Sequence, residues 1–206
     1  MSPKRIQRQR TRGWKAPAGA VYVGRGSIYG NPWRVDPAAA PQPGIVATHE
    51  EDVALLRRCI EVSRRSREHG NTPFGAILVS PDGEVLLEQE NIEIDTHRCT
   101  GHAETQLVDR ASQMFDKPYL ADCSLYTSAE PCAMCSGAIY WAGVGRVVYA
   151  MTERSLLRLT GANEQNPTFD LPCRQVFAAG QKDIEVVGPF EELEQEAADV
   201  HRGYWD

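Results

Sequence analysis

The chain has 206 residues, of which 42% are hydrophobic, 8% aromatic and 24% charged, values that are ordinary for a globular protein of one domain with a modest addition. Its longest aliphatic runs, such as Ala76–Val79, fall far below the roughly 20 apolar residues of a membrane helix. The basic start is not followed by the apolar stretch of a secretory signal, so the six cysteines are expected to be reduced thiols or metal ligands. We therefore expect a cytoplasmic protein without membrane contacts.

The net charge of -6 is unevenly distributed along the chain. Residues 1–35 carry eight Lys or Arg side chains and no acidic one, which leaves 14 basic residues (22 minus 8) against 28 acidic ones from Asp36 onward, a net charge of -14. A stretch rich in proline and alanine begins at Asp36 and is typical of a linker. These features predict a basic N-terminal segment (1–36), a linker (37–47) and a folded domain (48–206).

The predicted domain begins with a helix and a hairpin. Thr48 and Glu51 have the spacing of a capping box, and Gly70 suits the end of a helix that reaches His69. Two short apolar runs, 74–79 and 84–87, flank a Pro-Asp-Gly turn, which predicts two antiparallel strands.

Helices and strands alternate after the hairpin. We expect helices near 102–115, 132–142 and 191–201, strands near 124–128, 146–150 and 184–187, and a less regular region over 151–172. This order predicts an α/β layered domain with a mixed sheet.

Three residues have the chemistry of a zinc site. His102 lies at the start of a predicted helix, and Cys132 and Cys135 form a Cys-x-x-Cys pair that lets two thiolates meet one ion. Pro131 places Cys132 in the first turn of its helix, where the helix dipole favours a thiolate. Three protein ligands leave a fourth coordination position open, as in catalytic zinc sites.

Glu104 is the candidate proton carrier of this site. It follows His102 by two residues, and in a first turn both side chains can border one cavity. A carboxylate beside a metal-activated water can take a proton from it and return the proton to a leaving group.

Two alternatives leave this site without catalysis. Cys99 could complete a closed structural zinc site with His102 and the Cys-x-x-Cys pair, in a module that uses its basic segment to bind nucleic acid. The cysteines could also be free thiols packed in a core, with Glu104 on the surface. An open coordination position with bound water would distinguish a catalytic zinc site from the closed one.

His-x-Glu followed by Pro-Cys-x-x-Cys is the signature of the zinc deaminases. From about residue 50 to 206 the sequence resembles the cytidine deaminase-like superfamily, and within it the branch of bacterial guanine deaminases and tRNA adenosine deaminases. Pro73–Ala76, Asn91 and the string Leu125–Ala142 also carry this resemblance, and the last looks most like guanine deaminase. The resemblance implies a three-layer α/β fold, with helices on both faces of a mixed central sheet, and a homodimer.

The resemblance also implies a hydrolytic deamination with one Zn²⁺ per chain. The metal ligands would be His102, Cys132 and Cys135, and Glu104 would carry protons to a ring nitrogen and to the departing ammonia. The residues that the resemblance assigns to substrate binding are Phe74, Asn91, Ala103, Asp170 and Trp205. Asp170 is the least direct of these, because Thr-Phe-Asp-Leu stands here where guanine deaminases carry Phe-Asp-Asp.

We expect the substrate to be a free nucleobase, guanine or a related amino-purine or azine. The alternatives are an adenosine in tRNA, and cytosine or a nucleoside. The charge of -14 from Asp36 onward argues against a polyanionic substrate. Residues 1–35 resemble the opening of a small uncharacterised domain of bacteria and phages. This segment could bind nucleic acid, dock on the acidic domain or a partner subunit, or have no function of its own.

Overall fold

The computed structural model describes residues 47–161, 163–164 and 166–205. The predicted basic segment (1–36) and the predicted linker (37–47), apart from Ala47, lie outside these ranges. No helix in the described residues is long and apolar enough to cross a bilayer. The elements are α1 (His49–Glu68), β1 (Gly75–Val79), β2 (Val85–Glu90), α2 (Glu93–Thr96), α3 (Ala103–Met114), α4 (Lys117–Ala121), β3 (Ser124–Ala129), α5 (Ala133–Ala142), β4 (Arg146–Met151), α6 (Glu153–Thr160), α7 (Cys173–Ala178), β5 (Glu185–Val187) and α8 (Glu191–His201).

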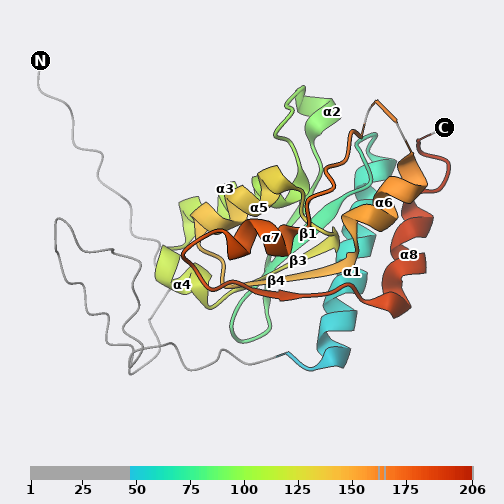
Figure 1. The fold of residues 1–206 in the computed structure, drawn as a ribbon. Coiled ribbons are helices and arrows are strands. Elements are labelled where there is room, and N and C mark those ends of the chain that lie inside the picture. The colour runs from blue at the N-terminus through green and yellow to red at the C-terminus, as the bar shows by residue number, and fades with distance from the viewer. Residues whose placement is uncertain (1–46, 162, 165, 206) are drawn as a thin grey trace, which may run out of the picture. The chain divides into compact units, whose positions relative to one another are not determined.

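The five strands form one mixed sheet in the order β2-β1-β3-β4-β5 (Figure 1). β1 runs antiparallel to both β2 and β3, whereas β3, β4 and β5 run parallel to one another. Ala129 at the end of β3 pairs with Met151 at the end of β4. The carboxyl ends of these two strands therefore meet at one edge of the sheet.

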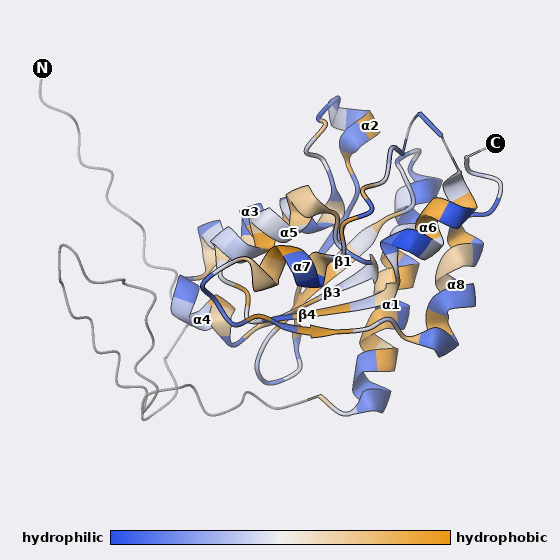
Figure 2. Ribbon diagram, in the orientation of Figure 1, coloured by the Kyte–Doolittle hydropathy of each residue, from blue (hydrophilic) through white to orange (hydrophobic). Residues whose placement is uncertain are grey.

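Helices cover both faces of the sheet, as the sequence predicted. Along β1, Ala76 and Leu78 point into a core shared with α3, α5 and α7, while Ile77 and Val79 point into a second core shared with α1, α6 and α8. Figure 2 shows β4 as a hydrophobic strand between these two helical layers. The alternation along each strand thus builds a three-layer fold with two cores.

The capping box at the start of α1 is confirmed. The Thr48 hydroxyl accepts the backbone N–H of Glu51 at 3.3 Å, and the Glu51 carboxylate accepts the backbone N–H of Thr48 at 2.7 Å. Gly70 follows the helix with φ of +88°, a left-handed conformation that glycine adopts without strain. The first element of the domain therefore begins and ends where its sequence signals place it.

The region expected to be less regular, 151–172, contains a helix. α6 begins after Thr152, whose hydroxyl accepts the backbone N–H of Ser155 at 3.0 Å. Leu156 is buried, but Leu157 and Leu159 are 38% and 48% exposed. Apolar residues on both faces of the helix hide its period in the sequence, which is why the prediction was wrong here. The short helices α2, α4 and α7 were also not predicted.

A buried ion pair joins α1 to the middle of the sheet. The Arg146 guanidinium on β4 donates to both Asp52 oxygens of α1, at 3.0 and 2.7 Å, and the Tyr126 hydroxyl on β3 donates to Asp52 Oδ1 at 2.6 Å. The side chains of Asp52 and Arg146 are only 5% and 12% exposed. Each charge is therefore satisfied by the other rather than by water.

Replacing Asp52 by Ala should lower the free energy of unfolding by about 3 kcal/mol or more, because it leaves the Arg146 charge buried without its partner. Glu185 pairs with the same Arg146 at 3.1 Å but is 56% exposed, so Glu185→Ala should cost less than about 1 kcal/mol. Denaturant titration of both variants measures the difference. Equal losses would contradict the buried character of the pair.

Candidate functional site

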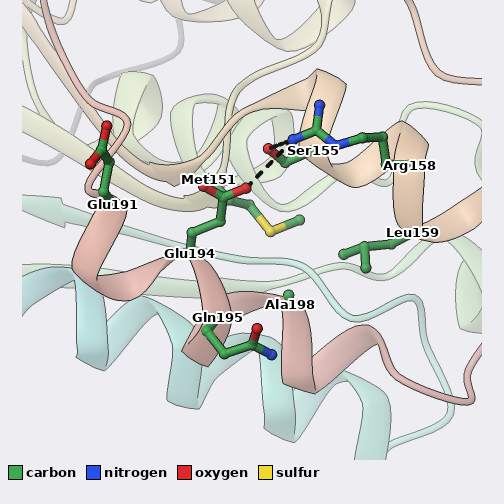
Figure 3. A pocket seen from close by; sticks show the side chains of 8 residues that line it. All are labelled: Met151, Ser155, Arg158, Leu159, Glu191, Glu194, Gln195 and Ala198. Atoms are coloured by element: carbon green, nitrogen blue, oxygen red, sulfur yellow. Dashed lines mark hydrogen bonds and ion pairs between the residues drawn. The ribbon is translucent and has the colours of Figure 1, made fainter.

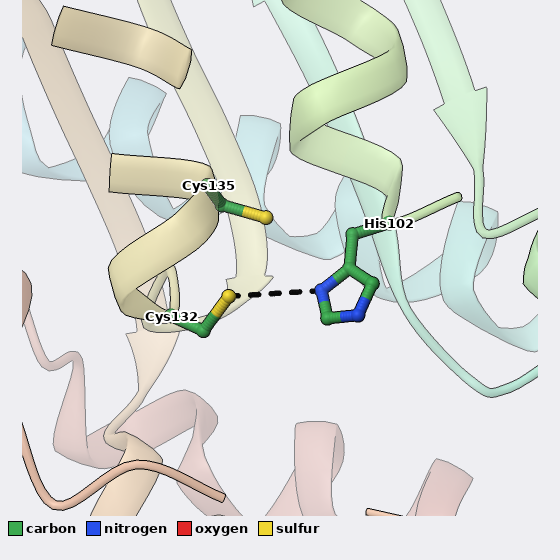
Figure 4. Close-up of side chains that lie close together, drawn as sticks. All are labelled: His102, Cys132 and Cys135. Carbon is green, nitrogen blue, oxygen red and sulfur yellow. Dashed lines mark hydrogen bonds between the residues drawn. The ribbon is translucent and has the colours of Figure 1, made fainter. Parts of the chain in front are cut away.

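The three predicted metal ligands lie together at two helix N-termini (Figure 4). His102 is the N-cap of α3, Cys132 is the N-cap of α5, and Cys135 lies in the first turn of α5. One nitrogen of the His102 ring and the two sulfurs all lie within 4.8 Å of one another, and His102 Nδ1 is 3.7 Å from Cys132 Sγ. α3 and α5 pack against each other on one face of the sheet, so their packing sets this distance.

The electrostatics of the cluster favour a thiolate. Interaction with Cys135 and with His102 lowers the pKa of Cys132 to about 4, against the opposing effect of burial. Burial disfavours the charged form of His102, but its hydrogen bond with Cys132 and the charge of Glu104 outweigh burial and raise its pKa to about 9. Without a metal, the site therefore pairs a thiolate with an imidazolium.

The donor set fits zinc. Two thiolates and one imidazole are ligands that zinc prefers, and three protein ligands leave one position for water or substrate. Thr105 Oγ1 lies 3.2 Å from Cys135 Sγ and supports that ligand. Cys99, the fourth ligand of the closed structural site considered above, is exposed and lies outside the cluster, which argues against that alternative.

Glu104 borders the ligand cluster, as expected for a first-turn residue of α3. It is only 6% exposed. Its Oε1 accepts the Thr127 hydroxyl at 3.3 Å and its Oε2 accepts the Cys135 thiol at 3.5 Å. Burial raises the pKa of Glu104, and the negative charge of Cys132 raises it further. A carboxyl group that contacts a ligand sulfur and is shielded from bulk water can exchange protons with a molecule bound at the cluster.

Asn91 presents a buried amide donor. Its side chain is 1% exposed, and its Oδ1 accepts the backbone N–H of Glu93 at 2.7 Å. Its Nδ2 has no hydrogen-bond partner within the described part of the chain. Because buried polar groups are rarely left unpaired, this donor is available to a ligand. Ala103, another predicted contact, is fully buried as the first residue of α3.

Phe74 and Trp205, two predicted contacts far apart in the sequence, lie close together. Their ring centroids are 6.3 Å apart, and the His201 ring lies 5.1 Å from Phe74. Trp205 Nε1 donates to His201 Nδ1 at 3.3 Å, and Asn163 Nδ2 donates to the Trp205 carbonyl at 2.8 Å. Burial, assisted by Arg67, lowers the pKa of His201 to about 4, so its ring is neutral and accepts this bond at pH 7.

Asp170 lies on the surface. Its side chain is 63% exposed and pairs with Arg154 at 2.6 Å. Among the described residues, Asp170 makes no contact with the His-Cys-Cys cluster. Its role in substrate binding therefore stays a prediction.

Two buried carboxyl groups beside the site were not predicted. Glu130 accepts the backbone N–H groups of Glu153 and Cys173 at 3.2 and 2.9 Å, and so joins the starts of α6 and α7. Glu153 is 7% exposed, and burial together with the charges of Cys132 and Glu104 raises its pKa to about 8. Both residues follow the paired ends of β3 and β4. Acidic residues just after two parallel strands are the signal that could have located them.

Two adjoining cavities lie between α6 and α8, away from the ligand cluster. One, of about 360 Å³, is crossed by Arg158, which lies 2.8 Å from the Ser155 hydroxyl and 3.7 Å from the Glu194 carboxylate (Figure 3). The other, of about 350 Å³, reaches His201 and Trp205. None of the three ligands lines either cavity.

Deamination by water at a metal needs a shielded carboxyl group beside the ion, and Glu104 is a buried carboxyl group beside the His-Cys-Cys cluster at two helix N-termini. The class of protein that this fold and site define is a hydrolytic deaminase. Residues 49–151 match the model of the cytidine and deoxycytidylate deaminase zinc-binding region, and the chain belongs to this family. Residues 6–72 also match a domain of unknown function (DUF4326), in agreement with the resemblance noted for residues 1–35.

The relatives differ in the bases that they are named for. A probable cytosine deaminase of Schizosaccharomyces pombe is 39% identical over 157 residues, which cover 76% of this chain and 94% of that protein. The guanine deaminase of Bacillus subtilis is 45% identical over 97 residues, 47% of this chain and 62% of that protein. A structure solved in complex with 2,6-diaminopurine is 27% identical, has a TM-score of 0.62, and aligns over 74% of this chain and 80% of that one. The predicted family and fold are confirmed.

Cys132→Ser should remove bound zinc, because it takes away one of two thiolates in a three-ligand site. Cys99→Ser serves as the matched control and should keep the zinc content of the unmodified protein, expected to be about one ion per chain. Elemental analysis of the purified variants measures this. Loss of zinc from the Cys99 variant would instead support the closed structural site with Cys99 as the fourth ligand.

Proposed function

We propose that the protein deaminates a free nucleobase, guanine or a related amino-purine or azine, with release of ammonia. The observation that carries this proposal is the position of Glu104, a buried carboxyl group 3.5 Å from a sulfur of the His-Cys-Cys cluster. The Asn91 amide nitrogen, which has no partner among the described residues, supports it, because it offers a buried donor for a polar ring.

We assign one zinc ion per chain to His102, Cys132 and Cys135. A zinc ion bound there supplies a nucleophilic water at neutral pH, because the ion lowers the pKa of water. The low pKa of Cys132 favours the thiolate form that metal binding requires.

Glu104 moves the protons of the reaction. It takes a proton from the water and delivers it to a ring nitrogen, which makes the amino-bearing carbon more electrophilic. The oxygen of the water then bonds to that carbon. Glu104 takes the second proton of this oxygen and gives it to the amino nitrogen, so that the carbon–nitrogen bond breaks and neutral ammonia leaves.

Four residues would bind and orient the base. The Asn91 amide would donate a hydrogen bond to an acceptor on the ring. Phe74 and Trp205, with centroids 6.3 Å apart, would contact its faces or its edge. Ala103 contributes a backbone N–H in the first turn of α3, where such groups have no partner within the helix.

The charge of the chain from Asp36 onward favours a small neutral substrate over tRNA. From Asp36 onward the net charge is -14, whereas binding a polyanion requires a basic surface. Cytosine is the second candidate, favoured by the 39% identity to the S. pombe protein over 94% of that protein's length.

We also propose a homodimer, as the resemblance to the deaminase family implies. Trp141 on α5 and Met114 on α3 are 69% and 58% exposed, and a second copy could cover either side chain. Sedimentation of the full chain tests this state, and a monomer at all concentrations would contradict it.

Glu104→Gln should lower the rate of ammonia release by at least about 100-fold, because the amide cannot accept and return protons. It should retain zinc and an unchanged melting temperature, because Gln fills the same buried space. Normal turnover by this variant would contradict the assignment of Glu104.

Ammonia release from a panel of bases tests the substrate. Guanine, isoguanine, adenine, cytosine and triazines are offered as free bases, with nucleosides and tRNA anticodon stem-loops as counter-tests. We expect turnover of guanine or a related base, with cytosine as the next strongest substrate. Activity confined to the RNA would overturn the proposal.

A further inference from the structure

We propose that Glu93 is a positioning residue for His102: its carboxylate faces the ring nitrogen that points away from the metal position and holds the ring in its ligating orientation. This inference rests on the zinc site proposed above. It concerns a residue that is neither a metal ligand nor one of the proposed base contacts.

The two nitrogens of His102 face different groups. Nδ1 lies 3.7 Å from Cys132 Sγ, on the side of the cluster, and Nε2 lies 3.9 Å from Glu93 Oε2. An imidazole that binds a metal through one nitrogen carries its hydrogen on the other. With the metal on the Nδ1 side, the Nε2–H therefore points toward the Glu93 carboxylate.

The 3.9 Å between His102 Nε2 and Glu93 Oε2 is too long for a hydrogen bond, but it is close enough for the charges of the two groups to attract. The Glu93 side chain is 35% exposed, so it has room to rotate toward the ring. The position of its backbone, in contrast, is fixed by several neighbours.

The backbone of Glu93 is held from both sides. Its N–H donates to Asn91 Oδ1 at 2.7 Å, and its carbonyl accepts the N–H of Arg98 at 3.2 Å. Gly101, the residue before His102, approaches so closely that an added Cβ would lie 2.7 Å from Glu93 Cα. The Gly101 carbonyl also accepts the N–H of Ile92 at 2.9 Å. The 91–101 loop thus closes on itself and fixes Glu93 relative to His102.

This loop links the proposed base contact to the metal ligand. Asn91 uses its oxygen to fix Glu93, its nitrogen has no partner within the described residues, and Glu93 faces His102. A carboxylate on the outer nitrogen of a ligating histidine fixes the tautomer and makes the imidazole a stronger donor, and its loss typically weakens metal binding by about 10- to 100-fold. Glu93 should therefore slow the release of zinc.

The rate of zinc transfer to an excess of a chromophoric chelator measures this effect without any substrate. We expect Glu93→Ala to release zinc about 10-fold faster or more, and Glu93→Asp to recover part of the difference. Asp95→Asn is the matched control, because it removes the same charge from the same short helix while its partner is Asn71 rather than His102. Cobalt-substituted protein gives a second readout, since a changed imidazole donor shifts the visible absorption of the bound ion.

Release at the unmodified rate from Glu93→Ala, with an unchanged cobalt spectrum, would overturn the proposal. Equal acceleration by Asp95→Asn would also overturn it, because the effect would then come from the charge of the loop and not from contact with His102. Circular dichroism and melting temperature show whether each variant is folded. If Glu93→Ala speeds zinc release as expected but the unmodified protein deaminates no base, the role of Glu93 stands and only the proposed function is refuted.

Discussion

The N-termini of α3 and α5 meet on one face of the sheet, and the proposed metal ligands and proton carrier all depend on this contact. Each helix contributes its first residues: His102 and Glu104 from α3, Cys132 and Cys135 from α5. The two helices are held together by a core that includes Leu107, Ala111 and Ile139, all fully buried. Because helix N-termini favour negative charge, this arrangement gathers thiolates and a carboxylate that would repel one another elsewhere.

The Cys132 thiolate and the carboxyl groups of Glu104 and Glu153 give the site an excess of negative charge when they are ionised. Burial raises the pKa values of both Glu104 and Glu153, and the Cys132 charge raises them further, while the hydrogen bond with Cys132 and the charge of Glu104 together outweigh burial and raise the pKa of His102. A divalent cation would relieve this imbalance and free the imidazole as a ligand. The electrostatics are thus consistent with the metal that the donor set favours, and Glu93 extends the same arrangement to the outer side of His102.

The His-x-Glu and Cys-x-x-Cys motifs, the first helix and the alternation of strands and helices could be predicted because their signals are local: residue types at a fixed spacing, a capping box, an apolar pattern. The three-layer arrangement and the joint role of the motifs came from the resemblance to a family. The helix α6 could not be predicted, since Leu157 and Leu159 face outward and blur its period. Glu130 and Glu153 each follow a strand, which is a local signal, but their meeting depends on the parallel register of β3 and β4, which no local pattern contains. The pairing of Phe74 with Trp205 joins residues far apart in the chain, and only the folded structure brings their rings together.

The central claim is an open zinc site with three protein ligands, and X-ray absorption at the zinc edge of the isolated protein tests it most directly. The scattering should fit two sulfur ligands, one imidazole nitrogen and one further light atom, at the distances typical of four-coordinate zinc, about 2.3 Å for sulfur and about 2.0 Å for nitrogen. Three sulfurs and one nitrogen would contradict the account, because they would mean a closed structural site that includes a further cysteine.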